Sequence, residues 1–91
     1  MSIRVKIPSA LRDATKGEAE VYGEGHNLKI LIDGLESKYP GLRDGIYDDG
    51  GRLQRFVNIF VNDTNIQSLS NELTSLEDGD EVVIVSAVST E

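Results

Sequence analysis

The chain has 91 residues, with 16 acidic against 9 basic side chains and a formal net charge of −7. That length predicts one domain, residues 1–91, with no room for a deep cofactor cavity beside a catalytic cleft. We therefore expect a carrier, a binding module or a subunit, and not an enzyme. The negative charge disfavours nucleic-acid and membrane partners and suits a partner with a basic surface. Solubility alone would explain this charge equally well.

The composition also excludes several kinds of site. There is no cysteine, hence no disulfide, thiolate metal site or cysteine nucleophile. The single histidine, His26, lies in a glycine-rich turn and cannot form a zinc site alone. The aspartates of Asp48-Asp49 lie in a turn, where aspartate hydrogen-bonds its own backbone. We predict no catalytic residue, no metal and no bound cofactor.

No targeting or membrane segment is visible in the sequence. Residues 1–6 lack the apolar core of a signal peptide, and no apolar run approaches the length of a membrane span. We expect a cytoplasmic protein.

Two short strands are predicted first. Residues 3–7 alternate apolar and polar side chains, and Pro8 ends this strand. Residues 18–22 predict a second strand, with Ala19 and Val21 on one face. Together they suggest an N-terminal hairpin.

One main helix follows the hairpin. Asn27 is a good N-cap, and Pro40 with the glycine after it stops the helix. Gly34 weakens the helix by up to ~1 kcal/mol relative to alanine and would let a neighbouring strand approach closely. The predicted apolar stripe consists of Leu28, Leu31, Ile32, Leu35 and Tyr39.

Residues 40–52 are rich in glycine and aspartate and predict a loop of turns, with a short helical turn over residues 42–47 at most. We expect this loop to be too polar to belong to the core.

The strongest strand pattern covers residues 56–61. Three β-branched residues share one face, and Phe56, Asn58 and Phe60 share the other. Apolar residues on both faces predict a central position in the sheet. We expect Phe56, Asn58 and Phe60 to form a partner-binding face.

A polar connector and the last strand complete the chain. Leu69, Leu73 and Leu76 are the expected anchors of the connector, and an acidic turn over residues 77–80 leads into a β-branched strand. The order is strand, strand, helix, strand, short strand, strand. It predicts an α+β fold, a mixed sheet of four to five strands with one main helix packed on one face. This is the β-grasp, or ubiquitin-like, arrangement, with the first and last strands parallel and adjacent at the sheet centre.

Several segments resemble the β-grasp sulfur carriers of the ThiS/MoaD type. Residues 53–63 (LQRFVNIFVND) resemble their central strand, and residues 76–84 (LEDGDEVVI) resemble their last turn and strand. The start over residues 7–12 (IPSALR) is most similar to the actinobacterial carriers of cysteine biosynthesis. The small subunit of molybdopterin synthase belongs to the same group. The resemblance covers nearly the whole chain.

The resemblance implies a mechanism. An E1-like adenylyltransferase and sulfurtransferase would adenylate the C-terminal carboxylate with ATP, and a sulfur donor would convert the adenylate into a thiocarboxylate. The carrier would present this sulfur to a cysteine-synthase-like or other sulfur-accepting enzyme, without doing catalysis itself. The tail residues that would enter the partner's channel are Ala87, Val88, Ser89, Thr90 and Glu91.

The last residues depart from the family's pattern. The family ends in Gly-Gly, because a Cβ would clash in the narrow channel that the tail threads, whereas this sequence reads Thr90-Glu91. Thr90 is β-branched, and Glu91 adds a negative charge beside the carboxylate to be activated. Three functions stay open: a sulfur carrier, a non-covalent β-grasp binding module or paralogue without the reactive end, and a ubiquitin-like modifier of lysines.

Overall fold

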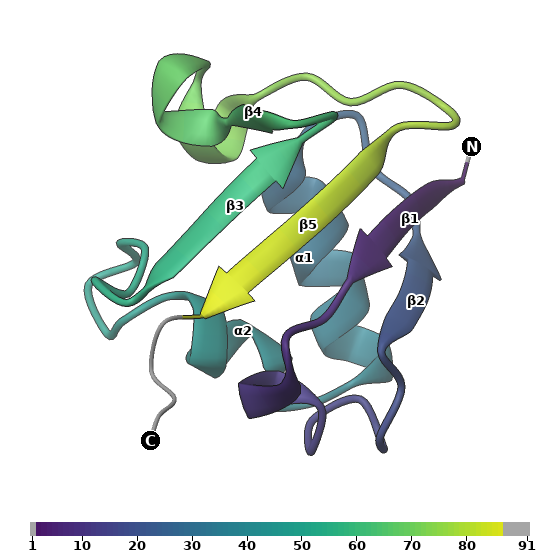
Figure 1. Ribbon diagram of the computed structural model, residues 1–91, viewed down its shortest axis with the longest axis vertical. Coiled ribbons are helices and arrows are strands. Elements are labelled where there is room, and N and C mark those ends of the chain that lie inside the picture. The colour runs from purple at the N-terminus through teal and green to yellow at the C-terminus, as the bar shows by residue number, and fades with distance from the viewer. Residues whose placement is uncertain (1, 87–91) are drawn as a thin grey trace.

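The computed structural model describes residues 2–86 (Figure 1). The strands are β1 (Ile3–Lys6), β2 (Glu20–Gly23), β3 (Val57–Val61), β4 (Thr64–Asn65) and β5 (Glu81–Ser86). The α-helices are α1 (Leu28–Lys38) and α2 (Leu42–Ile46). Three short 3-10 turns are η1 (Ser9–Leu11), η2 (Ile66–Ser68) and η3 (Asn71–Leu73).

The strands form one mixed sheet of five strands in the order β2-β1-β5-β3-β4. Strand β5 lies in the middle, parallel to β1 with Val5 opposite Val82, and antiparallel to β3 with Ile59 opposite Ile84. Helix α1 crosses one face of the sheet (Figure 1). The parallel central pair of first and last strands confirms the predicted β-grasp fold.

The core lies between α1 and the sheet. Asn27 caps the helix as predicted, since its Oδ1 accepts a hydrogen bond from the Ile30 N–H at 2.9 Å. The buried residues of the helix face are Leu28, Leu31, Ile32 and Leu35. They pack with the alternate residues of β1, β3 and β5 that face the helix, because side chains in a strand point alternately to its two faces.

The strand limits differ slightly from the prediction. Strand β2 begins at Glu20, so Ala19 precedes it and is exposed while Val21 is buried. Strand β3 begins at Val57 and lies between the central β5 and the two-residue edge strand β4. It is therefore an interior strand, but not the central one.

The expectation that residues 40–52 are too polar for the core is wrong. The segment contains α2, and both Leu42 and Ile46 are fully buried. Their spacing of four places them on one side of a single helical turn. The glycines and aspartates that suggested a loop are mostly exposed around them.

Two further expectations are also wrong. Leu76 is buried, but Leu69, which follows η2, and Leu73, which ends η3, are 44% and 61% exposed. No strand approaches Gly34 closely, since the nearest atom outside the helix to a Cβ there would be the Glu24 carbonyl oxygen, at 3.9 Å. The close approach lies at Gly25, where a Cβ would be 2.6 Å from the Leu31 backbone nitrogen.

Candidate functional site

The start of β5 is held by the acidic turn before it. Asp80 accepts hydrogen bonds from the Glu77 N–H at 2.8 Å and from the Asn62 side-chain amide at 3.0 Å. Gly79 adopts a φ of 90° and donates its N–H to the Ser2 carbonyl at 2.9 Å. Hydrogen bonds thus join the turn to the end of β3 and to the start of β1, and they fix the start of β5 between these two strands.

The other end of β5 is the candidate site. Ser86 lies opposite Val57, the first residue of β3, and is the last residue that the structure describes. The predicted tail residues lie outside the described residues, and their role stays a prediction. They are Ala87, Val88, Ser89, Thr90 and Glu91.

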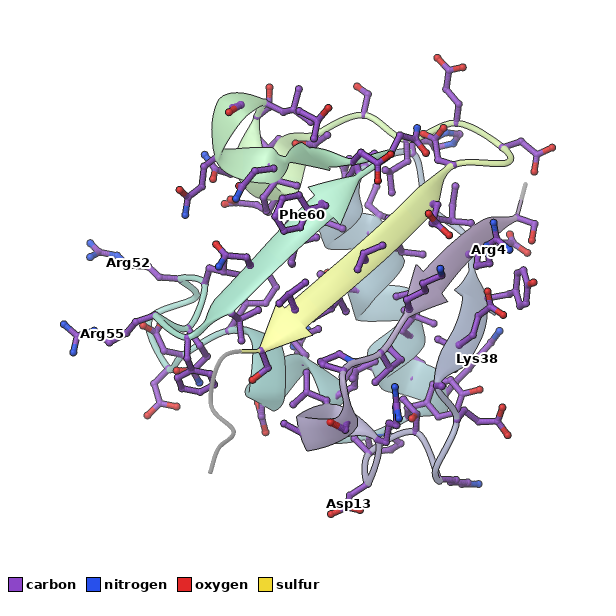
Figure 2. The ribbon with its side chains drawn as sticks, viewed as in Figure 1. Arg4, Asp13, Lys38, Arg52, Arg55 and Phe60 are labelled. Atoms are coloured by element: carbon purple, nitrogen blue, oxygen red, sulfur yellow. The ribbon has the colours of Figure 1, made fainter. Side chains whose placement is uncertain are left out.

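The sheet face opposite α1 carries an apolar strip over β3 and β5. Phe60 lies opposite Val83, and Asn58 lies opposite Val85. Val85 is 41% exposed, whereas the other three residues are half-buried. We call Asn58, Phe60, Val83 and Val85 the open face. Figure 2 shows Phe60 on this side of β3, with Arg4 on the same side of β1.

Phe56 does not share the strand position of Asn58 and Phe60. It precedes β3 in a turn and packs against the buried core. Val83 and Val85 also belong to the open face, although the sequence pattern did not predict this. Their strand is apolar at every position from 82 to 85, so no alternation distinguished its two faces.

An ion-pair network borders the open face. Arg4 lies 3.3 Å from Glu20 and 3.3 Å from Glu81, and Lys6 lies 3.4 Å from Glu81. These side chains are partly exposed, so each pair adds little to stability. The network instead holds polar groups in fixed places beside the apolar strip.

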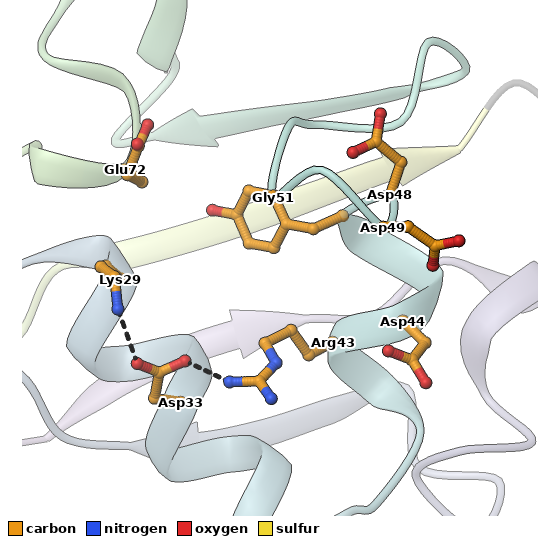
Figure 3. A pocket seen from close by; sticks show the side chains of 9 residues that line it. Lys29, Asp33, Arg43, Asp44, Asp48, Asp49, Gly51 and Glu72 are labelled. Carbon is orange, nitrogen blue, oxygen red and sulfur yellow. Dashed lines mark hydrogen bonds and ion pairs between the residues drawn. The ribbon is translucent and has the colours of Figure 1, made fainter.

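A recess of about 400 Å³ lies on the other side of the molecule (Figure 3). Asp33 accepts hydrogen bonds there from Lys29 at 3.1 Å and Arg43 at 2.8 Å, and the bond from Arg43 lowers the pKa of Asp33. The Tyr47 hydroxyl is buried without a hydrogen-bond partner, and burial raises its pKa to about 12. The contacts of Asp33 link α1 to α2, and we assign them a structural role.

Within residues 2–86, no group of three or more histidine or acidic side chains is placed to hold a metal ion. No helix of that part is both long enough and apolar enough to cross a bilayer.

The sheet order and the single main helix define the class as β-grasp. The chain belongs to the ThiS family, whose family model matches residues 5–89. It is 38% identical over 91 residues to the sulfur carrier protein CysO of Mycobacterium tuberculosis, and the match covers 98% of each chain.

Solved structures agree with this assignment. The crystal structure of M. tuberculosis CysO matches with a TM-score of 0.90 and 39% identity, covering 94% of this chain and 99% of that one. A chain of the Amycolatopsis orientalis BexX/CysO complex matches with a TM-score of 0.90 and 31% identity, covering 98% and 99% of the two chains.

Proposed function

We propose that this protein is a sulfur carrier. The terminal carboxylate attacks the α-phosphorus of ATP in an E1-like partner, and pyrophosphate leaves. A sulfide donor then attacks the acyl carbon of the adenylate, and AMP leaves to give a thiocarboxylate. The observation that carries the proposal is the match to the ThiS family along residues 5–89, together with 38% identity to a protein named as a sulfur carrier.

The chain's part in this reaction is presentation. The partner binds ATP, and the carrier supplies the end of a strand held firmly at the sheet centre, between β1 and β3. A second enzyme, of the cysteine-synthase-like or another sulfur-accepting kind, then takes the sulfur. Such a cycle belongs in the cytoplasm, where ATP is supplied.

The open face is the docking surface in this proposal. An apolar strip bordered by charged groups is typical of a protein interface, and aromatic residues are enriched at the centres of such interfaces. Phe60 has this position, with Val83 beside it and Asn58 and Val85 nearer the end of β5.

Mass spectrometry of the intact protein tests the covalent step. The chain is incubated with the E1-like enzyme of its host, ATP and sulfide, beside a variant that carries Thr90→Gly and Glu91→Gly. We expect an oxygen-to-sulfur mass increase in the unaltered protein and faster conversion in the variant, because glycine removes the Cβ atoms and the extra charge. An unaltered protein that is never converted would exclude sulfur carriage for this form.

A non-covalent binding module is the second candidate, favoured by Thr90-Glu91 where the family has Gly-Gly. Conversion of the glycine variant alone, with both proteins binding the enzyme equally well, would support this candidate. Conversion of the unaltered protein would exclude it.

A further inference from the structure

Arg52 and Arg55 lie close together in the loop that precedes β3. Both residues are exposed, and neither guanidinium makes an ion pair or a hydrogen bond with any part of the chain that the structure describes. Arg4, Lys29 and Arg43, by contrast, are each held by carboxylates. Arg52 and Arg55 are thus two unpaired arginines, separated by only two residues, in a chain with 16 acidic residues. We call Arg52 and Arg55 the arginine rim.

The loop that carries the arginine rim is fixed in place. The Asp48 side chain accepts hydrogen bonds from the N–H groups of Gly50 at 2.9 Å and Arg52 at 3.0 Å. The Asp48 N–H donates to the Arg52 carbonyl at 2.7 Å, and the Gln54 N–H donates to the Ile46 carbonyl at 2.9 Å. Hydrogen bonds within the loop and to α2 therefore hold the backbone that carries both arginines.

The side chains of this loop divide into two sets. Leu53 and Phe56 pack against the core, whereas Arg52 and Arg55 point into solvent at the edge of the molecule where β3 begins (Figure 2). The loop also exposes Asp48 and Asp49, but the Asp48 carboxylate accepts backbone N–H groups, whereas neither guanidinium has a partner in the described structure.

The arginine rim borders the end of β5. Arg55 lies two residues before Val57, which pairs with Ser86 at the end of β5. A partner that docks at the end of β5 would therefore lie beside this loop.

We propose that the arginine rim binds carboxylates of the activating enzyme beside the channel that receives the end of the chain. This inference rests on the proposed function. The guanidinium group suits carboxylates because its planar donors bind both oxygens at once. The overall charge of −7 steers the chain toward a basic surface of the enzyme. A few carboxylates on that surface would then favour the one orientation in which the arginine rim contacts them.

Charge reversal with a matched control tests the inference. Variant R52E/R55E is compared with K16E/K38E, which changes the net charge equally at two other exposed cations. Figure 2 places Lys38 at the opposite edge of the molecule from the arginine rim. Pyrophosphate release by the host's E1-like enzyme is measured against the concentration of each carrier, after circular dichroism has shown that the variants fold.

We expect R52E/R55E to raise the KM for the carrier about tenfold with kcat unchanged, and high salt to reduce the difference. The control is expected to stay close to the unaltered protein. An equal rise in the control would overturn the inference, since overall charge would then suffice. A changed KM for ATP would also overturn it, because the rim would then act on phosphate.

The two proposals fail in different ways. If the unaltered protein is activated and R52E/R55E has the same KM for it, only the arginine rim is refuted. If the unaltered protein is neither activated nor bound by the enzyme, the carrier function and the rim are refuted together.

Discussion

Substitution of two glycines near α1 by alanine should change the free energy of unfolding in opposite directions. Gly34 is exposed inside the helix and has nothing close to its Cβ position, so Gly34→Ala should raise the free energy of unfolding by about 0.5–1 kcal/mol. Gly25→Ala should lower it by roughly 1–3 kcal/mol, because the new Cβ meets the Leu31 backbone. Urea unfolding of both variants measures this. Equal effects of the two substitutions would contradict the packing described around them.

Substitution of Tyr47 tests the effect of a buried hydroxyl on stability. Its hydroxyl is buried and unpaired, so Tyr47→Phe should raise the free energy of unfolding by about 1 kcal/mol at neutral pH. Burial raises its pKa from 10.0 to about 12, so the unfolded state loses the proton first and stability falls as pH rises through this range. Tyr47→Phe should remove that fall in alkaline unfolding curves. Tyr22→Phe, at a residue 55% exposed, is the control and should leave it in place.

Helix α2 depends on a side chain from another element. Glu36 of α1 accepts hydrogen bonds from the N–H groups of Gly41 at 3.0 Å and Arg43 at 2.8 Å, and these bonds lower its pKa. Glu36→Ala should therefore cost about 1 kcal/mol at neutral pH by uncapping α2. A lowered pKa means that this contribution is lost as pH falls and Glu36 takes up a proton.

Thermal unfolding at neutral and acidic pH measures the effect of Glu36→Ala. Glu24→Ala is the matched control, since Glu24 is exposed and its carboxylate makes no bond in the described structure. A loss as large in acid as at neutral pH would show that Glu36 acts through packing and not through its charge.

The same elements show how far the sequence predicts structure. Helical spacing and the Asn27 cap located α1, and alternation located β1. The short helical turn at α2 was predicted but its burial was not, because its capping group lies earlier in the chain, in α1, and its two core residues are surrounded by turn-forming ones. Local pattern cannot reveal a contact that another element supplies.

For the molecule as a whole, the order of the elements predicted the β-grasp topology, whereas the residues of the open face were predicted only in part. Asn58 and Phe60 were predicted from alternation in β3. Val83 and Val85 could not be assigned to a face, because a continuous apolar strand has no alternation to read. The docking role of the open face also depends on the partner's surface, which this sequence does not encode.

That role yields a prediction that separates docking from folding. Val85 and Leu73 are both exposed, at 41% and 61%, but only Val85 lies on the open face. Val85→Asp and Leu73→Asp add the same charge and should both leave a folded protein. Only Val85→Asp should raise the KM for the carrier in activation, because a carboxylate would have to be desolvated in the apolar contact. Equal KM values for the two variants would mean that the partner approaches the end of β5 without covering the open face.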